Sequence, residues 1–164
     1  MGNEMMVWVW VIIAVVLLFV VIYNLNHGIR ISYRLKERRR SRQLRIINHY
    51  RRKHRLPPLK VYYELDRIAK SHSKYMARHH TCNHNGFASR AARVRKLTGS
   101  GFVAENCFRY PARHYNTRLA IKLIKGWMQS PGHRANLLNP NFKRLGIGIV
   151  VSKKYCYATQ VFSG

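Results

Sequence analysis

The stretch WMQSPGHRANLL, residues 127–138, contains the boundary between two predicted helices and places a histidine just inside the second. Ser130 can cap a helix through its hydroxyl, and Pro131 suits the first helical position because it has no N–H to leave unpaired. A helix is therefore expected to begin here. His133 would lie in its first turn, where the positive end of the helix dipole disfavours protonation. A neutral imidazole can accept a proton or bind a metal, although a lone histidine is equally compatible with a structural hydrogen bond.

Residues on both sides of this stretch follow helical or strand periodicity. Apolar spacing predicts helices around 43–53, within 61–80, at 89–97 and within 116–129, with Asn116 or Thr117 as the cap of the last. We expect a strand at 102–110 and a hairpin at 144–162 around the polar turn 152–154. Helices first and an antiparallel sheet mostly last indicate an α+β domain with helices packed on the sheet.

The amino-terminal residues predict a membrane segment. Residues 5–23, MMVWVWVIIAVVLLFVVIY, contain no charge and no proline. As a helix they would span roughly 29 Å, close to the thickness of a bilayer core. A cleaved signal peptide is disfavoured, because a basic n-region and a small-residue cleavage site are not apparent. The expected organisation is a short tail at 1–4, one uncleaved transmembrane helix at 5–23, a basic juxtamembrane linker at 24–42 and a folded domain at 43–164.

The charge of the chain indicates an anionic partner. There are 31 Lys and Arg against 5 Asp and Glu, a formal net charge of +26. Anionic lipid headgroups and acidic cell-surface polymers both fit this charge. Nucleic acid is disfavoured, because the chain has no recognised nucleic-acid-binding motif and the anchor restricts access. Twelve Lys and Arg lie between Gly28 and Arg55, and the positive-inside rule would place the domain in the cytoplasm.

The three cysteines, Cys82, Cys107 and Cys156, have no CxxC spacing, so neither a zinc knuckle nor a redox motif is predicted. One disulfide and a free thiol are expected outside the cell, and three reduced thiols inside. Cys107 and Cys156 are the first pair to test for a disulfide, because both fall in predicted strands.

Several motifs occur in a characteristic order along residues 44–164. They are INHYRRKHRLPPL, HNGFASR, AEN and WMQSPGHRANLL, followed by FKRLGIGI and YATQVF. Together they resemble the CAP superfamily, also called SCP/TAPS, which includes cysteine-rich secretory proteins, venom antigens and plant pathogenesis-related proteins. The resemblance is to the short prokaryotic members. It implies a CAP-type α-β-α sandwich with a small antiparallel sheet and a central cleft lined by two histidines and one or two acids.

Carried over by motif, the cleft residues are His84 of HNGF, Glu105 of AEN and His133 of SPGH, with Ser130 and Asn136 beside them. Eukaryotic relatives often have a second glutamate where this chain has Ser130. The resemblance therefore implies an incomplete four-residue set, which weakens any mechanism that needs two carboxylates.

Glu105 begins an apolar strand, where an unpaired charge would be costly, so we expect it to have a partner. Two alternatives remain for the cleft. Some relatives bind zinc or another divalent ion through the histidine pair, which would here be His84 and His133, whereas a plain hydrogen-bonded network would require no cofactor. We expect Asn106 and Asn136 to tie the strand to a neighbouring loop, and Arg90 and Arg134 to support loops more than to bind an anion.

Two functions follow from the resemblance. The first is a membrane-anchored, non-catalytic module that binds a lipid or a cell-surface component, and the missing second acid favours it. The second is a metal-assisted or Glu/His hydrolase, similar to a peptidase, that uses His84, Glu105 and His133. The family is predominantly extracytoplasmic, so we expect the domain outside the membrane despite the positive-inside rule. His72, on the apolar face of the 61–80 helix, is expected to be a hydrogen-bonded core histidine.

Overall fold

The chain divides into two compact units, residues 1–38 and residues 39–164. The computed structural model describes residues 2–164, except for the side chains of 2–7, 9, 11, 32, 33, 35, 36, 38 and 39. Helix α1, Gly2–Lys53, runs through both units, so the residues predicted as linker are helical. Within the described residues, Ile12–Ile31 is long and apolar enough to cross a membrane, with a mean hydropathy of 2.2. Met1 and several side chains of the predicted 5–23 segment lie outside the described residues.

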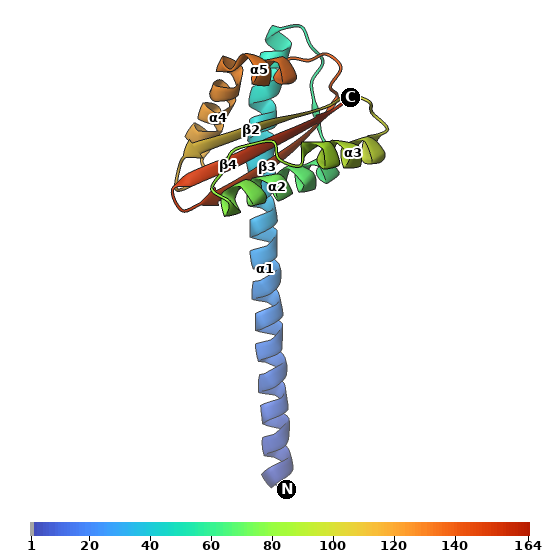
Figure 1. The fold of residues 1–164 in the computed structure, drawn as a ribbon. Helices are drawn as coiled ribbons and strands as arrows, with labels where there is room; N and C mark the ends of the chain where they lie inside the picture. The colour runs from blue at the N-terminus through green and yellow to red at the C-terminus, as the bar shows by residue number, and fades with distance from the viewer. Residues whose placement is uncertain (1) are drawn as a thin grey trace. The chain divides into compact units, whose positions relative to one another are not determined.

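A four-stranded sheet forms the centre of the second unit (Figure 1). Its strand order is β1-β3-β4-β2, in which β1 pairs parallel with β3 and the other neighbours are antiparallel. β1 has only two residues and gave no periodic signal in the sequence. The elements after α1 are β1 (Lys60–Val61), α2 (Tyr63–Arg78), α3 (Phe87–Thr98), β2 (Val103–Pro111), α4 (Thr117–Gln129), α5 (Pro131–Leu137), β3 (Arg144–Ser152) and β4 (Tyr155–Ser163).

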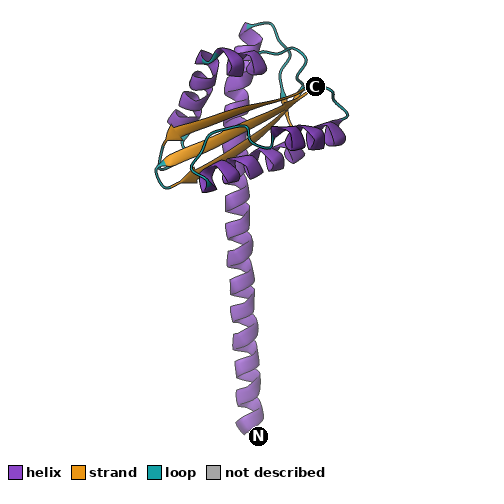
Figure 2. Ribbon diagram, in the orientation of Figure 1, coloured by secondary structure: helices purple, strands orange, loops and turns teal. Residues whose placement is uncertain are grey.

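Helices cover both faces of the sheet (Figure 2). On one face, α2 and α3 pack through Leu65 and Val94 against Val161 of β4. On the other face, Trp127 of α4 and Ile47 of α1 belong to the larger apolar cluster, which also contains α5 and β3 residues. The α-β-α sandwich expected from the sequence is confirmed. Strand alternation then decides which helices each strand side chain meets.

Two glycines allow α2 to lie directly on β3. A Cβ atom at Gly146 would overlap the backbone of Leu65, and one at Gly148 would overlap the backbone of Ala69. The GIG part of the FKRLGIGI motif is therefore a packing feature. The hydroxyl of Ser73 donates to the Gly148 carbonyl at 3.1 Å and secures the same contact.

Arg51, at the end of α1, is completely buried and bonds to backbone carbonyls. Its Nε donates to Pro57 at 2.8 Å, and Nη1 donates to Leu137 at 2.9 Å and to Asn139 at 3.0 Å. Nη2 donates to Phe142 at 3.3 Å. Burial lowers the pKa of this guanidinium. One cation thus satisfies carbonyls at the end of α5 that the helix leaves without partners.

Cys82, Cys107 and Cys156 form no disulfide bond, so the pair named as the first to test, Cys107–Cys156, is not formed. In the β2–β4 ladder Cys107 lies opposite Thr159, whereas Cys156 lies opposite Tyr110. Thr159 and Cys156 are three residues apart on one strand, so their side chains point to opposite faces. The two thiols are therefore separated by the sheet, and placing both in strands was not enough to predict a pair.

Candidate functional site

Glu105 is the centre of the candidate site. It lies in β2 on the face covered by α2 and α3, and its side chain is 1% exposed. Arg90 of α3 donates to both carboxylate oxygens at 2.8 Å, and Nδ1 of His84 lies 2.9 Å from Oε1. Burial alone would raise the pKa of Glu105, but the hydrogen bonds from Arg90 and His84 outweigh it and lower the pKa. The carboxylate is therefore ionised and held on both oxygens.

His84 is carried by the loop between α2 and α3. The side chain of Asn83 accepts a hydrogen bond from the backbone of Asn85 at 3.1 Å, and Gly86 then turns the chain with φ 74°. Nη1 of Arg90 donates to the Asn85 carbonyl at 2.7 Å, so this arginine supports the loop as well as the acid. Half of the His84 side chain is exposed, and Nδ1 of its ring is the nitrogen that contacts Glu105.

His133 is the third residue of α5 and is half-buried. Ser130 is the N-cap residue by position, but its side chain forms no capping hydrogen bond, which corrects the expectation from the sequence. Burial, followed by the charge of His84, lowers the pKa of His133. The two imidazoles therefore lie close enough to interact electrostatically. Nδ1 of His133 is buried and has no hydrogen-bond partner among the described residues.

A network of amides connects α5 to β2. Asn106 Nδ2 donates to the His133 carbonyl at 3.1 Å and to Gln160 Oε1 at 3.3 Å. Asn136 Nδ2 donates to Asn106 Oδ1 at 2.8 Å and lies 3.5 Å from the Glu105 carbonyl. The two asparagines have the structural role expected for them, but they tie the strand to helix α5 and not to a loop. Asn136, assigned to the cleft by resemblance, belongs to this supporting network.

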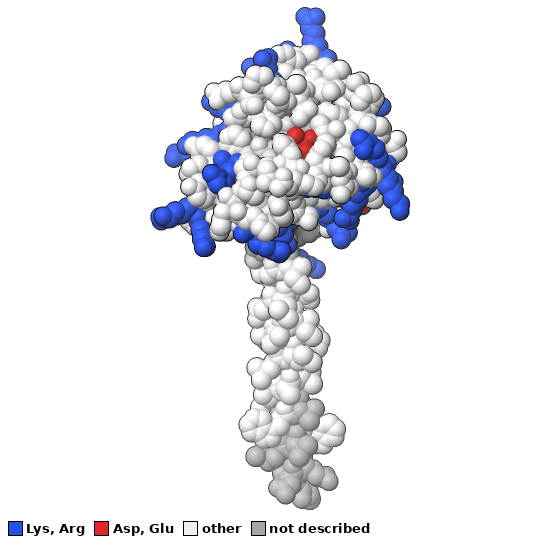
Figure 3. All heavy atoms as spheres, viewed as in Figure 1, with Lys and Arg blue, Asp and Glu red and all other residues white. Residues whose placement is uncertain are grey.

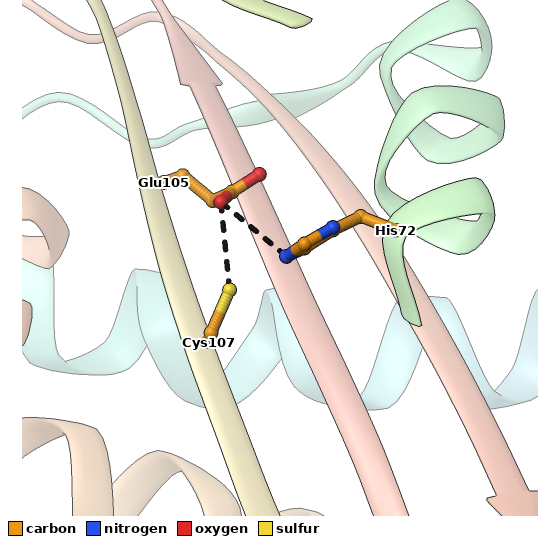
Figure 4. Close-up of side chains that lie close together, drawn as sticks. All are labelled: His72, Glu105 and Cys107. Carbon is orange, nitrogen blue, oxygen red and sulfur yellow. Dashed lines mark hydrogen bonds and ion pairs between the residues drawn. The ribbon is translucent and has the colours of Figure 1, made fainter. Parts of the chain in front are cut away.

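Two residues near Glu105 were not predicted for the site (Figure 4). His72 Nε2 lies 3.8 Å and Cys107 Sγ 3.5 Å from Glu105 Oε1, both in buried positions. The sequence held a signal for Cys107, because residues two apart on a strand share a face. His72 is hydrogen-bonded to the Asn83 carbonyl at 2.8 Å, which confirms it as a satisfied core histidine. Its approach to the acid depends on how α2 crosses the sheet, which the sequence does not show.

His72, Glu105 and Cys107 bring three potential metal ligands within 4.8 Å of one another. The donor set nevertheless fits a resident metal poorly. Both oxygens of Glu105 are held by Arg90, and His72 Nε2 is bonded to a carbonyl. Burial, followed by the charge of Glu105, raises the pKa of the Cys107 thiol, so a metal that bound the thiolate would have to displace this proton. The side chains instead form a closed hydrogen-bonded cluster.

The histidine pair expected to bind zinc has one favourable feature and one unfavourable feature. A metal-binding histidine usually donates its second ring N–H to a carboxylate or carbonyl, and His84 has such a partner in Glu105. His133 Nδ1 has none among the described residues. Within the part of the chain that the structure describes, the cluster of three potential metal ligands contains neither His84 nor His133. His84 and His133 would therefore offer two ligands, fewer than a zinc site normally uses.

The α-β-α sandwich, with a buried acid on β2 and histidines from the α2–α3 loop and α5, defines a CAP-type domain. The model of the Cysteine-rich secretory protein family (CAP) matches residues 44–162, so the chain belongs to that family. The expectation drawn from the motifs is thus confirmed.

Two bacterial relatives are longer than the matched region. The uncharacterized protein YkwD of Bacillus subtilis is 49% identical over 43 residues, which is 26% of this chain and 16% of YkwD. An extracellular SCP-domain protein of Bacillus anthracis matches with 29% identity and a TM-score of 0.58, over 75% of this chain and 39% of the other. This chain therefore covers well under half of either protein.

Two further solved structures are similar in fold alone. An outer surface protein of Borrelia burgdorferi has 19% identity and a TM-score of 0.62, and the match covers 73% of this chain and 87% of that one. The zinc-containing structure of NaASP2 has 13% identity and a TM-score of 0.51, over 65% and 60% of the two chains.

Proposed function

We propose that this CAP protein is a non-catalytic binding module held at a membrane by its apolar helix. Its ligand, a lipid or a cell-surface component, would bind beside the half-exposed ring of His84, with the ring of His133 as the second contact. The proposal rests on the state of Glu105, whose oxygens are both engaged by Arg90. A carboxylate held in this way is a poor general base, because accepting a proton would break charge-assisted hydrogen bonds.

The position of Ser130 supports the same proposal. Where eukaryotic relatives often have a second glutamate, this chain has a serine, so a paired-carboxylate mechanism lacks one partner. His133 has a lowered pKa and is neutral at pH 7, as a hydrogen-bonding group for a ligand would be. The half-exposed ring of His84 would supply a second polar group for the ligand.

A binding and activity comparison tests this proposal. The full chain in detergent micelles is titrated with a fluorescent fatty acid and, separately, with a fluorescent cell-wall glycan fragment. Replacing both His84 and His133 with glutamine should weaken binding of one probe at least tenfold, since a ligand group left without its hydrogen-bond partner costs roughly 1–3 kcal/mol. The exposed His114→Gln is the matched control and should leave binding unchanged. Unchanged binding of both probes by the double variant would contradict the role of the cleft.

A hydrolase is the second candidate, and the His84–Glu105 contact at 2.9 Å favours it. A carboxylate on Nδ1 orients an imidazole, so Nε2 of His84 could activate a water molecule. Hydrolysis of labelled casein or of a nitrophenyl ester would then depend on Glu105. Loss of such an activity in folded Glu105→Gln would favour the enzyme over the binding module.

We further propose that residues 39–164 lie outside the membrane and that the apolar helix is an uncleaved anchor. The B. anthracis relative is described as extracellular, whereas the cations that follow the apolar segment argue for the opposite orientation. Protease treatment of intact cells distinguishes them. A domain that is digested only after the membrane is opened would refute the external location, and a mature chain lacking the helix would refute the anchor.

A further inference from the structure

The outer face of α2 carries a row of cations opposite the side that packs on the sheet. Arg67, Lys74 and Arg78 are exposed and lie at i, i+7 and i+11, so the helix turns them to the same side. Ser71 completes the row between the first two. At 1.5 Å per residue the row is roughly 16 Å long. Lys74 and Arg78 are four residues apart, a like-charge spacing that destabilises a helix unless anions offset it.

The neighbouring helix extends this charged surface. α3 packs on the same sheet face as α2, through the cluster that joins Leu65 and Val94. Figure 3 shows basic side chains around the rim of this unit, including the part where α2 and α3 lie, with few acidic atoms on the same face. Together the two helices expose six cations, named here the α2–α3 basic face: Arg67, Lys74, Arg78, Arg93, Arg95 and Lys96.

Acids near this surface do not neutralise it. The first turn of α2 holds Glu64 and Asp66. Asp66 is paired with Arg40 and accepts the backbone N–H of Ile147 at 2.7 Å, so it is directed toward the domain. Glu64 is half-buried and lies before the first cation of the row, so its single negative charge does not balance the cations that follow it.

We propose that the α2–α3 basic face binds a linear phosphodiester polymer that lacks bases, such as a polyol phosphate. Four of its six cations are arginines, whose planar forks match phosphate oxygens. An extended row of cations suits a chain with regularly repeated charges. This partner surface is additional to the cleft and does not depend on the cleft being a ligand site.

Two other anionic partners fit the surface less well. Single-stranded nucleic acid is usually held by aromatic platforms. The row itself contains no aromatic side chain. Exposed Tyr63 lies one turn before the row. Tyr75 beside it packs against His72 and His79, at ring distances of 5.8 and 4.4 Å, so successive aromatic platforms do not follow the row. Binding to a bilayer surface by an amphipathic helix requires apolar side chains that can insert. The aliphatic residues of α2, among them Ile68 and Met76, are packed into the core, whereas its exposed large apolar side chains are the two tyrosines.

Titration with a synthetic polymer tests the proposal. The full chain is held in nanodiscs of neutral phosphatidylcholine and titrated with fluorescent poly(glycerol phosphate) at several salt concentrations. The Arg67→Gln/Lys74→Gln/Arg78→Gln variant should bind roughly 10- to 100-fold more weakly in 0.1 M salt. The slope of log affinity against log salt should fall by about two, as expected when three phosphates of a flexible strand are no longer neutralised. Arg93→Gln/Lys96→Gln on α3 should also weaken binding.

The matched control removes three exposed cations with similar helical spacing from α4, in Arg118→Gln/Lys122→Gln/Lys125→Gln. This variant should change the affinity less than threefold, and both triple variants should melt at the wild-type temperature. Equal loss in the α2 and α4 variants would overturn the proposal, because binding would then reflect net charge alone. An oligothymidylate that binds as tightly, with the same loss in the α2 variant, would replace the polymer with nucleic acid. Absence of polymer binding in 0.1 M salt would also overturn it.

Discussion

Replacing Arg90 with methionine is expected to destabilise the domain strongly, because this arginine neutralises a buried carboxylate. The Glu105 side chain is 1% exposed and Arg90 16%, so solvent screens their interaction little. Two hydrogen bonds to a charged group would be removed, each contributing about 1.5–3 kcal/mol. The expected loss is about 3–5 kcal/mol, the range for removing one partner of a buried pair. For a domain of this size, that lowers the melting temperature by roughly 10–20 °C.

Thermal unfolding followed by near-UV circular dichroism, with the full chain in detergent micelles, measures this effect. The matched control is Arg93→Met on the same helix, which is exposed and should cost less than about 0.5 kcal/mol. Adding Glu105→Gln to the Arg90 variant should recover part of the loss, because the orphaned charge is removed. Surface substitutions typically change the melting temperature by no more than about 2 °C. If Arg90→Met changed it by no more than that, the buried ion pair would not be a main stabilising contact. A double variant no more stable than Arg90→Met would refute the role assigned to the Glu105 charge.

Four other predictions concern the same domain. Arg51→Met should cost about 3–5 kcal/mol in urea unfolding, since it leaves buried carbonyls unsatisfied, and a loss under 1 kcal/mol would contradict the role of its hydrogen bonds. Gly146→Ala should cost about 2 kcal/mol or more, because its methyl group would meet the backbone of α2. Because the pKa values of His72 and His133 are lowered in the folded chain, the unfolded chain binds more protons below about pH 6.5. The stability should therefore fall as the pH decreases through that value. His133→Gln should make this pH dependence weaker in melting curves recorded at several pH values. In a thiol-labelling assay, Cys82 should react in the folded state and the other two thiols only after unfolding, whereas three fast-reacting thiols would refute their burial.

Local patterns predicted the elements of the fold well. The apolar stripes of α2 and α4 and the β-rich carboxyl-terminal residues correspond to what is observed, and Asn116 caps α4 through a 2.9 Å bond to the Leu119 N–H. Strand β1 was missed because two residues show no period. The hydroxyl of Ser130 was predicted to cap α5 because this serine precedes Pro131, but it forms no capping hydrogen bond.

The candidate site was predicted only where motifs carried it. His84 and Glu105 are in contact, and the demand that a buried acid should be paired was met by Arg90. The sequence could not predict which cation pairs with Glu105, because several arginines lie near the loop and only the packing of α3 brings one of them to the carboxylate. Cys107 shares a strand face with the acid and could have been found by alternation. The contact of His72 with Glu105 could not have been predicted, since helical periodicity indicates that His72 is buried but not which residue it contacts.

The position of Arg51 and Ile47 within α1 affects where residues 39–164 could be separated from the apolar segment. Both residues belong to the domain, although they lie on the same helix as the apolar segment. A fragment that starts at the first residue after α1 would lack a core side chain and the donor to the carbonyls at the end of α5. Cleavage or truncation intended to release a folded domain must therefore fall before residue 39, inside the helix and not at its end.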